Sequence, residues 1–167
     1  MKKIFAAAFL GLLALPFAFA GDATQSMAAH WKKSKEYTLA IAEQMPAADY
    51  GFKPNPAEMS FGEQMAHIAG ADGYFMSLLS GGKPPAGKPA NFDKDTVIAL
   101  LNTSFDYAIH AVENATPAQL AKTYKTPDGE MTGTEIVYFG LDHTTHHRGQ
   151  CVVYLRVKGI KPADYRY

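Results

Sequence analysis

The sequence predicts an all-α protein, an up-down four-helix bundle that is preceded by a cleavable signal peptide. Four long segments carry apolar residues at helical spacing, proline, glycine or capping sequences bound them, and an apolar run opens the chain. Amphipathic helices bury their apolar faces by packing into bundles. Because 167 residues suffice for one core, we expect residues 1–20 to be the signal peptide and residues 21–167 to be a single bundle domain.

The first twenty residues have the pattern of an export signal. Two lysines precede an apolar run at residues 4–19, and Ala18 and Ala20 supply small side chains where signal peptidase cleaves. The mature protein is then expected to begin at Gly21 and to be exported, either periplasmic or secreted. The alternative is a membrane anchor, but the run is shorter than the roughly 20 residues that span a bilayer, and Pro16 interrupts it.

The composition of the remaining chain excludes several classes of protein. Without the first twenty residues, 14 basic residues face 16 acidic ones, and the basic residues are scattered. This argues against nucleic acid as a partner, since a phosphate backbone needs clustered Lys and Arg. Cys151 is the only cysteine, so no internal disulfide can form. No later segment has the length of a membrane span, so none is expected after cleavage.

The first two helices have clear boundaries. A first helix is expected at residues 24–44, where Pro46 ends the apolar pattern. A second helix is expected from residue 61 to about residue 79. Ser60 comes directly before this helix and Glu63 lies in its first turn, which is the spacing of a capping box. Two glycines follow the helix.

The second half of the chain predicts two further helices and a small hairpin. The third helix begins at Asp93 or Asp95 and ends before a single extra turn at residues 116–120. Residues 123–133 alternate and contain an Asp-Gly pair, which favours a hairpin. A second capping box then opens the longest expected helix, at about residues 134–158.

Two histidines in the last helix suggest a metal site. His143 and His147 are four residues apart, so their rings project from neighbouring turns, about 40° apart around the axis. One metal ion can bridge two imidazoles in this arrangement. A catalytic ion usually takes three protein ligands and leaves a position open, so a third ligand must come from another helix.

His67 is the best candidate for that third ligand. It lies in the middle of the second expected helix, on a row that is otherwise apolar, where a polar ring needs a partner. His110 and His30 lie nearer the ends of their helices and have no partner at ligand spacing. We interpret them as structural or exposed, and they are the fallback ligands.

Other residues of the motif have alternative interpretations. His146 is three residues from His143 and could replace His147, but it is rotated about 100° from His147, so we expect it to contact a neighbouring helix or solvent. Arg148 could pair with an acidic residue or hold an anionic substrate. Cys151 is interpreted as a small buried residue. The whole cluster could also belong to a histidine-rich helix that binds no metal.

At the level of motifs, the chain resembles the DinB-like superfamily of four-helix bundles. The resemblance rests on QMAHI around His67, on HHRGQ at residues 146–150 and on YLRVKGIKP at residues 154–162, and it covers about residues 24–162. It implies a metal triad of one histidine in the second helix and a His-x-x-x-His pair in the last. The matching positions are His67, His143 and His147.

The resemblance also implies a function. Members bind a divalent metal, commonly nickel or zinc, while iron also accepts imidazole ligands. Characterised relatives include transferases that activate low-molecular-weight thiols such as bacillithiol, mycothiol or glutathione. A thiol or water bound to such an ion loses its proton and becomes a nucleophile. We therefore expect a metal-dependent enzyme, of a thiol S-transferase-like or hydrolytic kind, that acts on a small molecule.

Several alternatives stay open at this point. The runner-up is a non-catalytic metal-binding or stress-associated bundle, and a third is an interaction protein without metal. An enzyme should carry a base or an anion clamp near the open metal position. Arg148, Tyr74, Glu63 and Asp72 are the nearby candidates in the sequence. A homodimer is one expected form of assembly.

Overall fold

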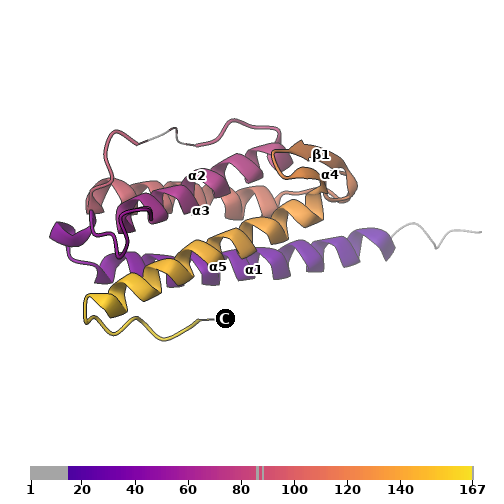
Figure 1. The fold of residues 1–167 in the computed structure, drawn as a ribbon. Helices are drawn as coiled ribbons and strands as arrows, with labels where there is room; N and C mark the ends of the chain where they lie inside the picture. The colour runs from indigo at the N-terminus through magenta and orange to yellow at the C-terminus, as the bar shows by residue number, and fades with distance from the viewer. Residues whose placement is uncertain (1–14, 86, 88, 167) are drawn as a thin grey trace, which may run out of the picture.

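Four long helices lie side by side in the computed structural model, which describes residues 15–85, 87 and 89–166 (Figure 1). These helices are α1 (Leu15–Gln44), α2 (Phe61–Ser80), α3 (Lys94–Glu113) and α5 (Gly133–Val157). The shorter elements are η1 (Ala47–Asp49), α4 (Pro117–Ala121) and the strands β1 (Thr123–Thr126) and β2 (Gly129–Thr132). The prediction of a mostly helical bundle with one small hairpin is confirmed.

The order of the helices around the bundle differs from the up-down arrangement that we predicted. α1 packs against α3 and α5, and α2 packs against the same two helices, whereas α1 and α2 are not main neighbours although they follow each other in the sequence. The start of α2 lies beside the start of α3, where a Cβ atom on Gly62 would overlap the carbonyl oxygen of Phe92. α2 and α3 therefore run parallel, and the up-down prediction is wrong on this point.

The connection between α2 and α3 explains this arrangement. It comprises residues 81–93 and returns along the length of the bundle (Figure 1). α2 has 20 residues and is therefore about 30 Å long, whereas 13 extended residues reach about 43 Å. Pro84, Pro85 and Pro89 favour such an extended path. The segment is thus long and stiff enough to bring the chain back before α3 begins.

Local capping sets the ends of the helices as the sequence predicted. Ser60 and Glu63 form both bonds of a capping box at α2, and Thr132 forms the same arrangement with Glu135 at α5. Of the two candidates at α3, Asp93 is the cap, since its carboxylate accepts from the amide of Thr96. α2 ends at a left-handed glycine. Helix ends that depend on residues close in the sequence could therefore be predicted.

The beginning of α1 differs from the prediction. The helix starts at Leu15, nine residues before the expected start at Thr24, and its 30 residues make it longer than α5. It passes through the predicted cleavage position after Ala20 and extends beyond the rest of the bundle (Figure 1). An apolar signal segment is also helix-forming, so periodicity alone could not mark the junction. Most of the proposed signal peptide, residues 1–14, lies outside the described residues, and its cleavage stays a prediction.

The core of the bundle is built around Trp31 on α1, which is fully buried. Its ring meets Phe105 of α3 edge-on, with the ring centroids 6.0 Å apart. Gly140 of α5 lies against the same indole, where a Cβ atom would come within 2.9 Å of the ring. Close approach of α5 to α1 therefore depends on this glycine.

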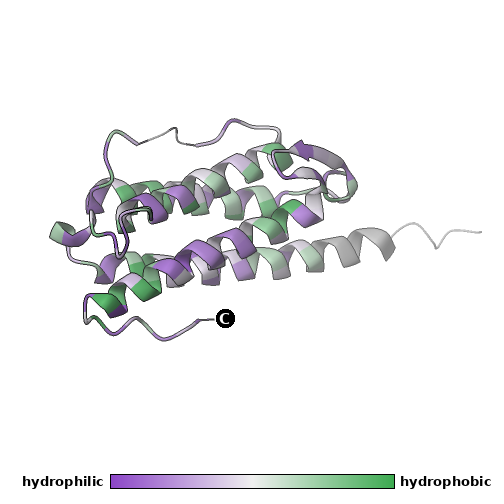
Figure 2. Cartoon of the chain, viewed as in Figure 1, coloured by the Kyte–Doolittle hydropathy of each residue, from purple (hydrophilic) through white to green (hydrophobic). Residues whose placement is uncertain are grey.

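The middle of α5 is hydrophilic although it crosses the centre of the bundle (Figure 2). Polar residues at such a position need partners or a function. The hairpin lies at one end of the same helix, and its strands pair Thr123 with Thr132. Among the helices that the structure describes, none combines the length and the hydropathy needed to cross a bilayer.

Candidate metal centre

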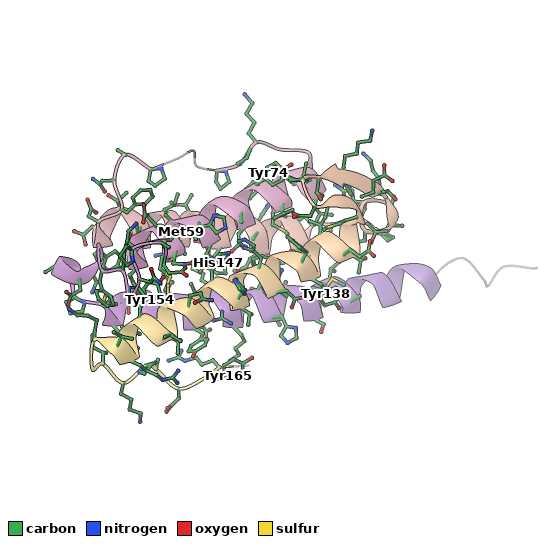
Figure 3. All side chains as sticks on the ribbon, in the orientation of Figure 1. Met59, Tyr74, Tyr138, His147, Tyr154 and Tyr165 are labelled. Carbon is green, nitrogen blue, oxygen red and sulfur yellow. The ribbon has the colours of Figure 1, made fainter. Side chains whose placement is uncertain are left out.

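Three histidine rings meet between α2 and α5, where Figure 3 labels His147. The two helices run antiparallel, so His67 of α2 faces His143 and His147 of α5. One potential ligand atom from each ring lies within 4.8 Å of the other two. The Nε2 atoms of His67 and His143 are 3.1 Å apart, and the ring centroid of His147 is 4.4 Å from that of His67. The three predicted residues are therefore brought together.

The geometry of this cluster fits a single cation. Two nitrogens that each lie about 2.1 Å from one ion are about 3.0 Å apart at a right angle and about 3.4 Å apart at the tetrahedral angle. The separation of 3.1 Å between His67 and His143 falls in this range. His67 is exposed while the other two rings are half-buried, so one side of the cluster remains open. Such an arrangement leaves coordination positions for a further ligand.

Gln64 fixes the orientation of His147. The side-chain oxygen of Gln64 lies 2.7 Å from Nδ1 of His147, and its amide nitrogen lies 3.4 Å from the hydroxyl of Tyr154. That hydroxyl donates its single hydrogen to the carbonyl oxygen of Met59 at 2.9 Å, so it can only accept from Gln64. The amide oxygen must then face His147 and accept from Nδ1. This leaves the lone pair of Nε2 free for a metal, the role that such hydrogen bonds play at metal-binding histidines.

Burial keeps the cluster uncharged. Loss of solvent, together with the neighbouring imidazoles of His67 and His146, lowers the pKa of His143 to about 4. The pKa of His147 is also lowered to about 4, first by burial and then by the rings of His143 and His67. The ring of His67 is only partly shielded from solvent, and this partial shielding also lowers its pKa. All three rings are therefore neutral near pH 7, and neutral imidazole is the form that binds metals.

Aromatic side chains surround the cluster on one side. The ring of Phe139 stacks on that of His143 at a centroid distance of 6.3 Å, and Phe75 meets Phe139 edge-on at 4.9 Å. Nδ1 of His143 is buried and has no hydrogen-bond partner among the described residues. The apolar surroundings of His143 account for its lowered pKa.

A cavity of about 790 Å³ opens beside the cluster, and His67 and His143 form part of its wall. This volume lies within the range of small-molecule sites. The wall comes from α2, from the connection to α3, from α3 itself, from the hairpin and from α5. Its side chains include Met59, Glu63, Tyr74, Phe75, Phe92, Leu100, Asp128 and Phe139.

Two of the acid–base candidates from the sequence line this cavity, and one does not. Tyr74 and Glu63 are in its wall. Glu63 is already engaged by the cap of α2 and by Lys53 at 3.3 Å. Asp72 is fully buried elsewhere in the α2–α5 interface and accepts a hydrogen bond from Thr144 at 3.0 Å. Asp72 is not among the residues that line the cavity, so the suggestion that it faces the open metal position is wrong. Burial raises the pKa of its carboxyl well above the usual range.

Arg148 has a role that the sequence did not predict. Its guanidinium donates to the hydroxyls of Ser34 at 2.9 Å, Thr38 at 3.1 Å and Thr145 at 3.2 Å, and lies over the ring of Tyr37. No carboxylate within the described part of the chain lies at ion-pair distance from it. Since residue 148 is rotated about 100° from residue 147, it enters the α1–α5 interface. The predicted place beside the metal is wrong. Instead of a direct ion pair with an acid, Arg148 has only a longer-range attraction to the carboxyl of Asp72 within the described residues.

The remaining candidates agree with their simpler interpretations. Cys151 is buried, and burial raises the pKa of its thiol, which makes it unreactive. His146 is exposed, with its ring edge-on to that of His147. His110 is exposed, and neither His110 nor His30 belongs to the histidine cluster. The prediction that His30 lies near the end of its helix is wrong, because α1 starts at Leu15 and His30 is in its middle.

Sequence reasoning missed two residues of the site. Gln64 lies three positions before His67, on the same face of α2, so helical spacing could have indicated it. Asp128 reaches the cavity from the tip of the hairpin. No local pattern indicates Asp128, because its place depends on how the hairpin packs against the helices.

The fold and the cluster define a helical bundle with a histidine site between its second and last long helices. The sequence profile of the DinB superfamily matches residues 30–151, which is most of the chain. The chain therefore belongs to the DinB superfamily. It is 21% identical over 140 residues to the uncharacterized protein YjoA of Bacillus subtilis strain 168, covering 81% of this chain and 91% of YjoA.

Two crystal structures show the same fold. The DinB-like protein YjoA from Bacillus subtilis aligns with a TM-score of 0.71 at 21% identity. A DinB-like protein from Bacillus cereus ATCC 10987 aligns with a TM-score of 0.72 at 17% identity. Each alignment covers 84% of this chain and 96% of the other. At this level of identity the likeness shows the fold alone.

Replacing Gln64 by leucine should lower metal affinity about 10- to 100-fold, because Nδ1 of His147 loses the acceptor that orients the ring. Titration of metal into the purified protein measures the change. Gln150→Leu is the matched control, since Gln150 makes no side-chain hydrogen bond within the described residues. Equal affinity in wild type and Gln64→Leu would show that this bond does not support the site.

The free energy of unfolding of the metal-free protein should fall as the pH is lowered from about 6.5 to about 4. In this window the unfolded chain takes up protons on His143 and His147, while the folded protein does so only near its lowered pKa of about 4. The decrease in the free energy of unfolding is complete once the pH is below that pKa. Urea unfolding at several pH values measures it, and a His143→Gln, His147→Gln double variant should show a shallower slope. An unchanged slope would contradict the assigned pKa shifts.

Proposed function

We propose that this protein binds one divalent metal ion through His67, His143 and His147. The observation that carries the proposal is the convergence of three neutral imidazoles, one of them oriented by Gln64. Nickel and zinc are the preferred ions, since both favour imidazole ligands, and iron is also accepted by this ligand set. Membership of the DinB superfamily supports the same role.

We further propose that the protein is a metal-dependent enzyme that acts on a small molecule, as a thiol S-transferase-like or hydrolytic catalyst. A divalent cation held by three neutral imidazoles lowers the pKa of a thiol or water beside it and so supplies a nucleophile near neutral pH. The protein's own contribution is to hold the rings in place and to keep their pKa low. The apolar wall around Phe75 and Phe139 excludes water from one side of the reacting centre.

The alternative proposal is a non-catalytic metal-binding bundle. One observation favours it: of the two acids in the cavity wall, Glu63 is engaged by Ser60 and Lys53, and Asp128 acts on His143 through its charge but makes no hydrogen bond to the histidines within the described residues. A general base would have to be within hydrogen-bonding reach of the reacting atom. Turnover of a substrate by the metal-loaded protein, lost on chelation, would exclude this alternative.

His67→Ala and His143→Ala should each lower metal affinity by more than about a hundredfold, since each removes a direct ligand rather than its hydrogen-bond partner. Helix content should be unchanged, because ample apolar surface flanks both positions. Elemental analysis and circular dichroism measure the two effects. The matched control is His146→Ala, an exposed histidine of the same motif that should retain the metal. Full metal content in either of the first two variants would contradict the assignment.

We also propose that the protein is exported, on the basis of the lysines and the apolar run in its first twenty residues. Expression of the full chain should yield a mature protein that begins at Gly21, as measured by mass spectrometry of its N-terminal peptide. An Ala18→Asp variant should remain uncleaved, since the peptidase reads a small residue at that position. A wild-type protein that keeps Met1 would contradict cleavage.

A further inference from the structure

We propose that Gly70 determines which substrates reach the histidine cluster, because the absence of a side chain at this position leaves the space beside His67 in which the body of the substrate lies. The substrate class is then a small molecule whose body is about the size of a phenyl ring and whose polar end reaches the histidines. The inference deepens the proposed function and rests on it for the identity of the reactive centre.

Gly70 lies in the middle of α2, next to a proposed ligand. It follows His67 by three residues, so the two positions are neighbours on the surface of the helix. It is exposed and forms part of the wall of the 790 Å³ cavity together with His67 and His143. This wall extends along α2 from Met59 to beyond Tyr74, both of which Figure 3 labels. The glycine is thus near the centre of the cavity wall on α2.

Packing explains the other two glycines of α2 but not Gly70. Glycine is less favourable in the interior of a helix than any residue except proline, so its presence there calls for a reason. A Cβ atom on Gly62 would overlap the carbonyl oxygen of Phe92, and one on Gly73 would come within 3.2 Å of Pro85. A Cβ atom on Gly70 would meet no atom of the described residues within 4 Å. It would extend into the cavity instead.

The surroundings of Gly70 offer room for an apolar group. The nearest residues of α2 that line the cavity, Ala66 and Ala71, are also small. On the side of α5, Phe139 lines the same cavity and its ring stacks on that of His143 at 6.3 Å. A ligand whose polar end lies beside His143 can therefore place its body against this ring, where an apolar or aromatic group is favoured. A larger side chain at position 70 would take up that space.

Two thiol probes that differ only in the size of their bodies test the inference: 2-phenylethanethiol and 2-mercaptoethanol. Their binding to the nickel-loaded full chain is measured by visible absorption. Gly70→Leu should weaken the binding of 2-phenylethanethiol at least about tenfold and that of 2-mercaptoethanol by less than about threefold, because the added side chain competes with the larger body alone. Nickel content should be unchanged. Equal effects on the two probes, or loss of nickel, overturn the inference.

Gly149 provides the matched control. It lies within α5, is exposed, and would place a Cβ atom more than 4 Å from every described residue, but it is not in the cavity wall. Gly70→Ala and Gly149→Ala should both raise the Tm by about 2–4 °C, since alanine is the better helix former. Gly149→Leu should leave the binding of both probes unchanged. A lower Tm for Gly70→Ala, or an equal loss of 2-phenylethanethiol binding in Gly149→Leu, overturns the inference.

A measurement without metal separates this inference from the proposed function. Binding of 2-phenylethanethiol to the chelated protein is followed by ligand-observed NMR, and Gly70→Leu should weaken it at least about threefold whereas Gly149→Leu should not. This result in a protein that binds no nickel would contradict the metal site and support the role of Gly70. A protein that binds nickel through His67, His143 and His147, but whose affinity for the probe does not depend on residue 70, would contradict the inference alone.

Discussion

Antiparallel packing of α2 against α5 creates the candidate site, and two polar contacts define the register of the two helices. The hydroxyl of Thr144 donates to the buried carboxyl of Asp72 at 3.0 Å, and Gln64 bonds to Nδ1 of His147 at 2.7 Å. Sliding one helix by a turn, about 5.4 Å, would leave these buried groups without partners, at about 1–3 kcal/mol each. The register that satisfies them is the one that places His67 opposite the two histidines of α5.

Burial has two effects at this site that act together. It keeps the imidazoles neutral near pH 7, with the pKa of His143 and His147 lowered to about 4, so a cation need not displace protons to bind. The aromatic side chains that shield the rings also form part of the wall of the adjacent cavity and give it its apolar character. The open side at His67 is where a ligand can reach both the histidines and this wall. A metal site and a substrate cavity are thus adjacent in one groove.

Much of the fold could be predicted because its signals are local. The capping boxes at Ser60 and Thr132, the extra turn at Thr116 and the hairpin all occur where the sequence indicated them. The parallel course of α2 and α3 could not be predicted from helix periodicity, because the path of the connecting segment depends on which faces of the helices pack. The early start of α1 was missed because an apolar leader has the same helical preference as the helix that follows it.

The sequence by itself determined which residues could form a metal site: His143 and His147 share one face of a helix whatever surrounds them, and His67 lies on an otherwise apolar row of another helix. Only the tertiary structure decided which neighbours complete the site. Arg148 enters the α1–α5 interface and Asp72 is buried away from the cavity, while Gln64 and Asp128 reach the groove. The physical reason is that helical spacing sets directions around one axis, whereas the contacts of a side chain depend on how that helix is rotated against its partners.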